Sequence, residues 1–140
     1  MRLRFRRSSR ITTTSANSLR LEHQEQAALF AWARLAQGRY PELRLLNASL
    51  SGVRLFPGQA RKAKSLGMVR GFPDVFLPVR KAGYGGLFIE LKRPRGGKIT
   101  PEQRAWLEEL GEQGYLAVCC RGFEEARTVI QSYLSEKLQG

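Results

Sequence analysis

Apolar residues recur at helical spacing at both ends of the chain and form short runs between them. The first periodic segment spans about Leu19 to Gln37 and is followed by Gly38. Its apolar positions are Leu21, Ala28, Leu29, Trp32 and Leu35. This spacing predicts a helix over 19–37 with one face toward a core.

The middle of the chain predicts shorter elements. Tyr40-Pro41 breaks the first helix, and the apolar run 43–48 predicts a strand before a turn at 49–52. A short basic helix is expected over 59–66, closed by Gly67. Two apolar runs, 74–79 and 85–93, then flank a glycine-containing loop, which is typical of a hairpin.

The last third returns to helices around one strand. Thr100-Pro101 is typical of a helix start, with Thr100 as the cap and Pro101 in the first turn of a helix that ends at Gly111. A strand is expected over 115–120. A final helix over 123–138 turns these residues to the core: Ala126, Val129, Ile130, Tyr133 and Leu134. The order of elements predicts an α/β domain, a mixed β-sheet flanked by α-helices.

The first 18 residues have a different composition. They hold five arginines, many Ser and Thr, and no acid. We expect a disordered basic arm over 1–18 and the folded domain over 19–140. An organelle transit peptide has a similar composition and is the weaker interpretation.

The charge of the chain indicates the class of its partner. Lys and Arg number 24 against 12 acids, a formal net charge of +12. Such a surplus favours a polyanion, most often nucleic acid, over a merely basic soluble protein or one that binds anionic lipid. No apolar run is long enough to span a membrane. Cys119 and Cys120 are adjacent and point to opposite strand faces, which predicts free thiols in a reducing cytoplasm.

The hairpin carries the candidate chemistry. Between Leu43 and Pro101 there are twelve basic residues and only two acids, Asp74 and Glu90. If Val79 pairs with Gly85, antiparallel counting sets Asp74 opposite Glu90, with Cβ atoms about 5 Å apart. Lys92 then shares the face of Glu90, while Ile89 and Leu91 point to the core.

Two facing carboxylates are suited to a hard divalent cation such as magnesium. A nearby lysine can orient water or stabilise charge on phosphate. A Pro-Asp strand start and a surface Glu-x-Lys ion pair are each common, but their joint spacing favours metal-dependent phosphodiester hydrolysis. We expect the nucleic-acid backbone to be held by these basic residues: Arg54, Arg61, Lys62, Lys64, Arg70, Arg93, Arg95 and Lys98.

Gly71-Phe72-Pro73-Asp74 followed by Glu90-Leu91-Lys92 resembles the motif of the PD-(D/E)XK nuclease superfamily. The finer pattern is similar to its virus-type replication-repair nuclease (VRR-NUC) branch. Further matching residues are Glu22, Gln26, Lys64, Gly67, Gln103 and Gly114-Tyr115. The resemblance covers about Leu21 to Leu134.

This resemblance implies a restriction-endonuclease-like core that depends on Mg²⁺ or Mn²⁺. The metal ligands would be Glu22, Asp74, Glu90 and the backbone carbonyl of Leu91. Lys92 would be the catalytic lysine, with Gln103 beside it at the site. The sequence alone favours a structural interpretation of Glu22, as an acid suited to a helix N-terminus, and the resemblance reverses that preference. Glu25 is the alternative ligand from the same helix.

Stand-alone members of the branch resemble phage and bacterial homodimers that cut branched DNA, including four-way junctions. The resemblance therefore implies a cytoplasmic, structure-selective DNA endonuclease that acts as a homodimer. Two alternatives remain open: a non-catalytic nucleic-acid-binding module on the same fold, and a restriction-type enzyme that reads base sequence.

Overall fold

The computed structural model describes residues 6–49 and 55–138. Its α-helices are α1 (Arg6–Leu35), α2 (Pro57–Ser65), α3 (Pro101–Glu112) and α4 (Gly122–Leu134). Two 3₁₀ turns, η1 (Ala36–Gly38) and η2 (Pro41–Leu45), follow α1. The strands are β1 (Asn47–Ala48), β2 (Val75–Leu77), β3 (Leu87–Lys92) and β4 (Leu116–Arg121).

The four strands of the described residues form one mixed sheet in the order β1-β2-β3-β4. The pairs β1–β2 and β2–β3 are antiparallel, and β3–β4 is parallel with α3 as the crossover. The predicted α/β class is confirmed. The predicted hairpin register is also confirmed, because Val75 pairs with Ile89 and Leu77 with Leu87.

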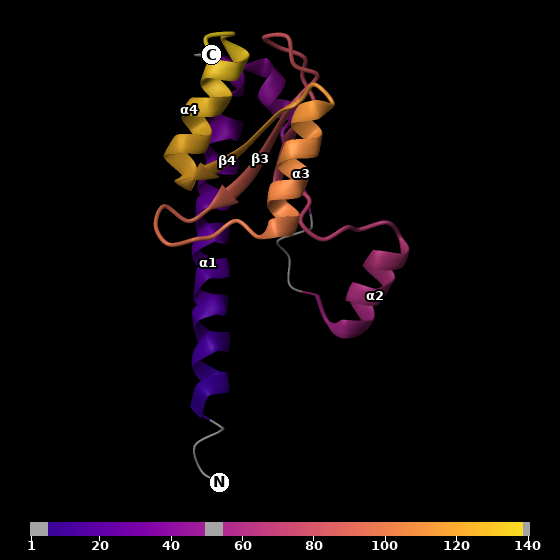
Figure 1. The fold of residues 1–140 in the computed structure, drawn as a ribbon. Helices are drawn as coiled ribbons and strands as arrows, with labels where there is room; N and C mark the ends of the chain where they lie inside the picture. Colours follow the sequence, from indigo (N-terminus) through magenta and orange to yellow (C-terminus); the bar gives the residue numbers. More distant parts are fainter. Residues whose placement is uncertain (1–5, 50–54, 139–140) are drawn as a thin grey trace.

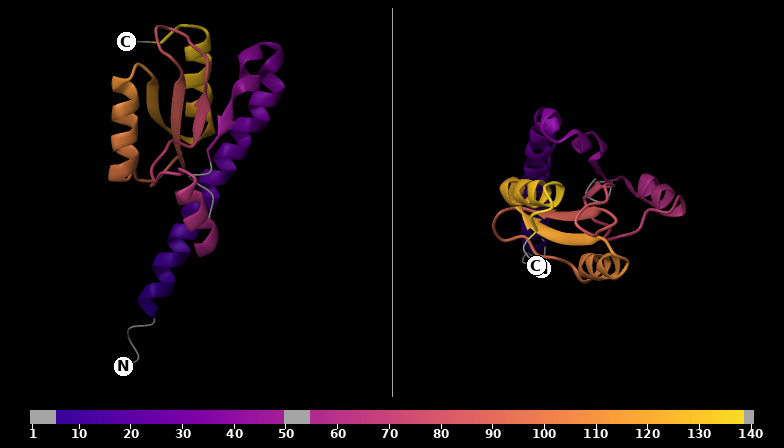
Figure 2. Two further views of the ribbon diagram at one scale, coloured as in Figure 1. Left: turned by 90° about the vertical axis from the view of Figure 1, so that its right-hand side faces the viewer. Right: turned by 90° about the horizontal axis from the view of Figure 1, so that it is seen from above.

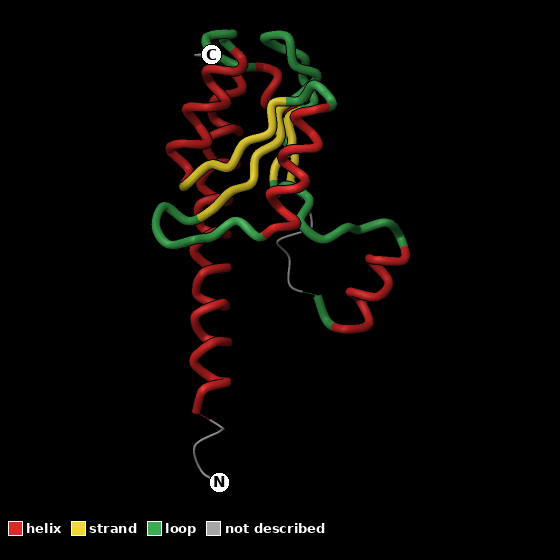
Figure 3. The backbone as a smooth tube through the Cα atoms, in the orientation of Figure 1, coloured by secondary structure: helices red, strands yellow, loops and turns green. Residues whose placement is uncertain are grey.

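Helices cover both faces of the sheet (Figures 1 and 2). In the side view of Figure 2, α3 lies on one side of the strands, and α4 and α1 lie together on the other. Figure 3 shows the loops gathered at the two ends of the strands. In the described part of the chain, no helix is long and apolar enough to cross a membrane.

The core lies between the sheet and the pair α1–α4. Leu87, Ile89 and Leu91 alternate along β3 toward this side, and each is 1% exposed. The predicted inner face of α4 is confirmed: Ala126, Ile130, Tyr133 and Leu134 are buried, and Val129 packs against them. The Tyr133 hydroxyl donates to the carbonyl of Val79, so α4 is fixed to the end of the hairpin.

Aromatic rings fill the opposite face of the sheet, under α3. Phe88 stacks on Phe76 with ring centroids 4.3 Å apart and meets Tyr115 edge-on at 5.2 Å. Because β3 side chains alternate, Phe88, Glu90 and Lys92 share this face. The strand therefore leads directly from the aromatic layer to the candidate site.

The first helix is longer than expected. It begins at Arg6 rather than at Leu19, so residues 6–18 of the expected disordered arm are helical, while residues 1–5 lie outside the described residues. No Gly or Pro interrupts residues 6–18. Once a helix is nucleated, each further residue adds a hydrogen bond at little entropic cost. At the other end, Leu35 is 88% exposed, and Ala33 takes the buried position we expected for Leu35.

The strand expected over 43–48 is mostly wrong. Only Asn47–Ala48 pairs with β2, while Pro41–Leu45 forms the 3₁₀ turn η2. Pro41 begins this turn, and Leu43 and Leu46, three residues apart, are both buried. A spacing of three fits a 3₁₀ turn, which places both leucines on one side. Of the turn expected at 49–52, all but Ser49 lies outside the described residues.

The basic helix expected over 59–66 is present as α2, which begins two residues earlier. It stands away from the sheet and the other helices (Figure 1). Its flanks expose large apolar side chains: Phe56 is 77% exposed, Leu66 76% and Val69 51%.

Candidate active site

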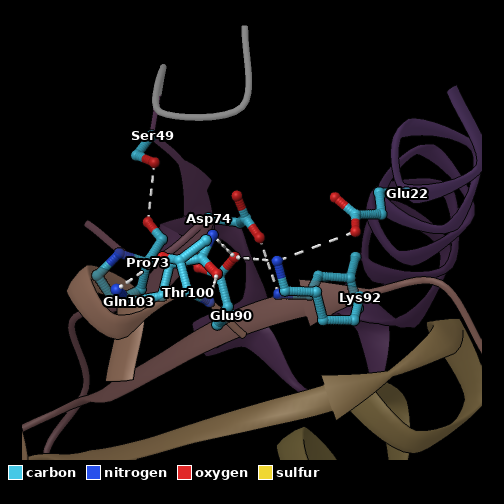
Figure 4. Close-up of polar contacts among 9 residues, drawn as sticks. Glu22, Ser49, Pro73, Asp74, Glu90, Lys92, Thr100 and Gln103 are labelled. Atoms are coloured by element: carbon cyan, nitrogen blue, oxygen red, sulfur yellow. Dashed lines mark hydrogen bonds and ion pairs between the residues drawn. The ribbon is translucent and has the colours of Figure 1, made fainter. Parts of the chain in front are cut away.

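Asp74 and Glu90 face each other at the end of the β2–β3 pairing. The register that joins Val75 to Ile89 sets Asp74 opposite Glu90 one position further on. The Asp74 carboxylate turns toward the neighbouring strand, where Oδ2 accepts a hydrogen bond from the Leu91 backbone N–H at 2.8 Å (Figure 4). The Asp74 carboxylate thus accepts a hydrogen bond that, in a regular antiparallel pair, a backbone carbonyl of the neighbouring strand would accept.

The carbonyl of Leu91 lies at the same edge. In an antiparallel ladder, the N–H and C=O of one residue point toward the same neighbouring strand. Continuing the register by two residues from Val75 places Pro73 opposite Leu91. Proline has no N–H to donate. The Leu91 carbonyl is therefore directed to the Asp74 edge, where Pro73 cannot pair with it.

Lys92 extends along the same face as Glu90. Its Nζ lies 3.4 Å from Glu90 Oε1 and 3.9 Å from Glu22 Oε1. Glu90 is 2% exposed and Lys92 5%, so this contact is buried. Burying charges is costly unless they are paired, and the pairing observed here accounts for their tolerance.

The two acids of α1 have different surroundings. Glu22 faces Lys92 and lines the pocket that contains Asp74 and Glu90. Glu25 Oε2 instead accepts a hydrogen bond of 2.7 Å from the N–H of Phe123, in the first turn of α4. A carboxylate there satisfies a helix N-terminus, which is a structural role. The site therefore receives Glu22 from this helix, and Glu25 holds α1 to α4.

Gln103 joins α3 to the site. The expected Thr100 cap is present as a capping box: Gln103 N–H donates to Thr100 Oγ1 at 3.1 Å, and Thr100 N–H donates to Gln103 Oε1 at 2.9 Å. Because Oε1 is engaged, the amide Nε2 points outward and donates to Glu90 Oε1 at 2.8 Å. The start of α3 thus fixes the orientation of Glu90.

Ser49 supports the strand that carries Asp74, a role that the sequence did not indicate. Its hydroxyl donates to the Pro73 carbonyl at 2.8 Å, and its N–H donates to the Asp74 carbonyl at 2.8 Å. Ser49 follows a strand of only two residues. No local pattern distinguishes it from a serine in an ordinary turn.

These groups line a pocket of about 260 Å³. Its lining includes Glu22, Asp74, Glu90 and Gln103 together with Arg70 and Glu102. Larger hollows in the described residues lie along the α2 segment and along α1, and the one at α2 shares Arg70 and Gly71 with the carboxylate pocket. We take this small pocket as the candidate site because charged side chains converge there. It is not the largest pocket of the described residues.

Burial and mutual repulsion alter the acidity of the carboxyl groups. Burial, followed by the negative charge of Asp74, raises the pKa of Glu90 to about 8. The pKa values of Asp74 and Glu22 are also raised, in both cases mainly by burial. The hydrogen bond from Leu91 and the charge of Lys92 act in the opposite direction on Asp74. The positive charge present in the site therefore does not fully balance the negative charge that its carboxyl groups would carry when ionised.

The residues of the site fit a divalent metal ion. The buried Glu90 Oε2 has no hydrogen-bond partner among the described residues. Such an atom is costly unless something binds it. The donors around it are carboxylate and carbonyl oxygens, which suit a hard cation. No three acidic, histidine or cysteine side chains in the described ranges are already gathered as a complete ligand set. In this arrangement the Lys92 ammonium lies between Glu22 and Glu90.

The predicted DNA-binding residues divide into three places. Arg61, Lys62 and Lys64 are exposed on α2. Arg93, Arg95 and Lys98 lie at the end of β3 and in the loop after it, with Arg93 half-buried. Arg70 lines the carboxylate pocket itself. Arg54 lies outside the described residues.

Comparison with known proteins identifies the class. The family model of the VRR-NUC domain matches residues 9–124. A solved VRR_NUC domain protein is similar in structure, with a TM-score of 0.69 and 28% sequence identity over 81% of this chain and 88% of that chain. No curated protein sequence matches the chain.

The chain therefore belongs to the VRR-NUC domain family, and the resemblance seen in the sequence is confirmed. Membership places the protein in a nuclease superfamily. It also implies, in general terms, a divalent metal in the reaction and DNA as the substrate.

The raised pKa of Glu90 predicts how stability depends on pH. Between its ordinary value of 4.5 and about 8, the folded state holds a proton that the unfolded chain has lost. The resulting stabilisation is complete below the lower value and disappears as pH rises through the upper one. With a chelator present, we expect the free energy of unfolding to fall by up to about 1.4 kcal/mol per pH unit in this window.

Urea unfolding of the wild-type protein and of Glu90→Gln, measured across that window, checks this expectation. Glutamine is neutral at every pH and removes the Glu90 contribution, so the variant should show a shallower decline. Equal slopes for the two proteins would show that Glu90 is ionised in the fold.

Proposed function

We propose that this protein is a metal-dependent, structure-selective DNA endonuclease that hydrolyses phosphodiester bonds in branched DNA such as four-way junctions. The observation that carries the proposal is the buried pair Glu90 and Lys92 beside the half-buried Asp74, with the unpartnered Glu90 Oε2. An acid with a raised pKa beside a second acid is typical of a catalytic site.

The metal would be Mg²⁺ or Mn²⁺, held by Glu22, Asp74, Glu90 and the carbonyl of Leu91. When bound, such an ion polarises a phosphoryl oxygen and lowers the pKa of a coordinated water. The Leu91 N–H keeps Asp74 Oδ2 in place at 2.8 Å. Gln103 fixes Glu90 through Oε1 at 2.8 Å and leaves Oε2 available as a ligand.

In the hydrolysis, a water oxygen forms a bond to phosphorus while the bond from phosphorus to one deoxyribose oxygen breaks. The water loses a proton, and the departing oxygen gains one. Lys92 is the catalytic lysine in this proposal. Its ammonium orients the attacking water and stabilises the negative charge that develops on the phosphate. Glu22 and Glu90, at 3.9 and 3.4 Å from Nζ, hold it in position.

DNA would reach the site along the basic surfaces on either side of it. One surface is α2 with Arg61, Lys62 and Lys64, and Arg54 precedes it in sequence. The other is the end of β3 and the following loop, with Arg93, Arg95 and Lys98. Phosphate contacts of this kind weaken steeply as salt is raised.

A homodimer would supply two active sites for the paired cuts that a four-way junction requires. The exposed Phe56, Leu66 and Val69 around α2 give an apolar surface on which a second copy can pack. A symmetric pair buries the same patch twice. The free thiols of Cys119 and Cys120 fit a reducing cytoplasm.

Two other functions compete with this proposal. A non-catalytic DNA-binding module would have no use for a buried lysine between two acids. A restriction-type enzyme would need an element that reads base edges in a groove. Within the described residues, α2 projects from the body and offers such an element, as does the N-terminal part of α1 (Figure 1).

The function is tested on a panel of flap, fork, four-way junction and linear duplex DNA, with Mg²⁺, with Mn²⁺ and with a chelator. We expect metal-dependent cleavage that favours the branched forms. Lys92→Ala should lower the cleavage rate by at least about a hundredfold while it leaves DNA affinity within about threefold, because the lysine acts on the reacting phosphate.

Lys137→Ala, which removes an exposed lysine of the C-terminal turn, is the matched control and should cleave as the wild type does. If none of the substrates is cleaved in a metal-dependent way, the nuclease proposal is contradicted. Cleavage that follows base sequence instead of branching would favour the restriction-type alternative.

The metal ligands are tested by calorimetric titration with Mn²⁺. Asp74→Asn should abolish binding, and Glu22→Gln should weaken it, because each removes a ligand charge. Glu25→Gln should bind metal normally yet lose about 0.5–2 kcal/mol of stability, since it weakens the contact at the start of α4. Metal loss in Glu25→Gln with normal binding in Glu22→Gln would reverse the assignment of the two acids.

The dimer is tested by light scattering of wild-type protein and of Leu66→Glu. We expect twice the mass of the chain for the wild type and the mass of one chain for the variant, because a buried unpaired charge opposes association. Leu35→Glu is the control, since Leu35 is 88% exposed at the far end of α1. A wild-type monomer, or a dimer unaffected by Leu66→Glu, contradicts this assignment.

A further inference from the structure

Arg70 differs from the other basic residues in its surroundings. It lines the same pocket as Glu22, Asp74 and Glu90. Both ion pairs among the described residues belong to Lys92, so no carboxylate in those ranges neutralises the exposed guanidinium of Arg70. An uncompensated cation in the wall of a pocket lined by acids is placed to bind an anion that enters the pocket.

The backbone of Arg70 is held against the start of α3. Gly71 has a φ of +90°, a conformation that favours glycine. A Cβ at this position would lie 2.8 Å from the carbonyl carbon of Glu102. Only a residue without a side chain permits this approach. The chain therefore passes in direct contact with the helix that also carries Gln103.

Trp106 completes the attachment. Its indole Nε1 donates a hydrogen bond of 3.1 Å to the carbonyl of Arg70. The indole ring packs edge-on against Phe72 at 5.2 Å, and Phe72 packs against Phe88 at 5.7 Å. Phe88 lies two residues before Glu90 on β3. Arg70 is thus tied through Trp106 to the strand that carries the acids.

We propose that Arg70 binds a non-bridging oxygen of the phosphate that is cut, and that Trp106 is the positioning residue that places it there. The inference rests on the proposed nuclease function and extends it to residues outside the carboxylate group. A guanidinium presents paired N–H donors that match phosphate oxygens, and its fixed charge stabilises the negative charge that grows during attack.

The basic residues of α2 do not share this arrangement, because none of them lines the pocket that contains the carboxylates. They would contact phosphates elsewhere along the DNA. Arg70 is expected to act on the rate of the chemical step, whereas Arg61, Lys62 and Lys64 act on affinity and its salt dependence.

The first test compares single-turnover cleavage at saturating DNA for Arg70→Ala, Arg70→Lys and the control Arg34→Ala. Arg34 is exposed on the last turn of α1, away from the site. Arg70→Ala should lower the maximal rate about tenfold to a hundredfold, the range expected for loss of a charged hydrogen bond. Lysine should restore part of it, and Arg34→Ala should match the wild type. A lower affinity with an unchanged maximal rate would overturn the proposal.

The second test asks whether Trp106 acts through Arg70. Phenylalanine at 106 keeps an aromatic ring but loses the indole donor, and we expect a rate about threefold to tenfold lower, as for loss of a neutral hydrogen bond. In the Arg70→Ala background, Trp106→Phe should have no further effect. Trp32→Phe, at the other tryptophan of the chain, is the control and should cleave normally. Equal effects of Trp106→Phe in both backgrounds would show that it acts on the fold alone.

The third test separates this inference from the nuclease proposal. Inorganic phosphate is titrated into wild-type protein and Arg70→Ala in the presence of Mg²⁺ and followed by phosphorus NMR. Phosphate affinity should fall at least about tenfold in the variant. Equal affinity overturns the role of Arg70 even if DNA is cut. Arg70-dependent binding in a protein that cuts no DNA would leave the anion site standing and reject the nuclease function.

Discussion

Two carboxyl groups are held together at the end of the β2–β3 pairing, and ionising both of them there is costly. Asp74 and Glu90 face each other because the hairpin register requires it. Burial and mutual repulsion raise the pKa of Glu90 to about 8. The Leu91 N–H, the Gln103 amide and the Lys92 ammonium each compensate part of this charge. In the enzyme we propose, a divalent cation would compensate the remainder of the negative charge.

The walls of the site come from separate layers of the fold. Glu22 arrives from α1, which packs on the core side, and Gln103 from α3, which packs on the aromatic side. The same contacts that hold these helices to the sheet also position the functional groups. Glu25 attaches α1 to α4, the Thr100 capping box sets Gln103, and Trp106 attaches the segment of Arg70 to α3. The interactions that pack the helices against the sheet are therefore the same ones that orient the side chains of the site.

The geometry of the site also separates the basic residues into two groups, those that attract the polyanion in general and the one that lines the pocket. Side chains on α2 and those of Arg95 and Lys98 in the loop after β3 are exposed and do not line the carboxylate pocket, so their charges act on the polyanion as a whole. Arg70 lines the pocket that contains the acids, and in our proposal its guanidinium meets the phosphate that is cut. A structure-selective nuclease needs both kinds of contact, because general attraction brings DNA to the surface and local geometry selects the bond that is cut.

The sequence by itself determined the features that depend on local periodicity and counting. These include the hairpin register, the Thr100 cap, the inner face of α4 and the placing of Glu90 and Lys92 on one strand face, since strand alternation and cap chemistry act over a few residues. It did not determine the start of α1 or the 3₁₀ turn at Pro41–Leu45, where the intrinsic preferences are weak. Only the tertiary structure decided that Glu22 rather than Glu25 enters the pocket, and that Ser49, Arg70 and Trp106 support it. Those choices depend on the rotation of a helix and on contacts between residues far apart in the chain, which no local pattern encodes.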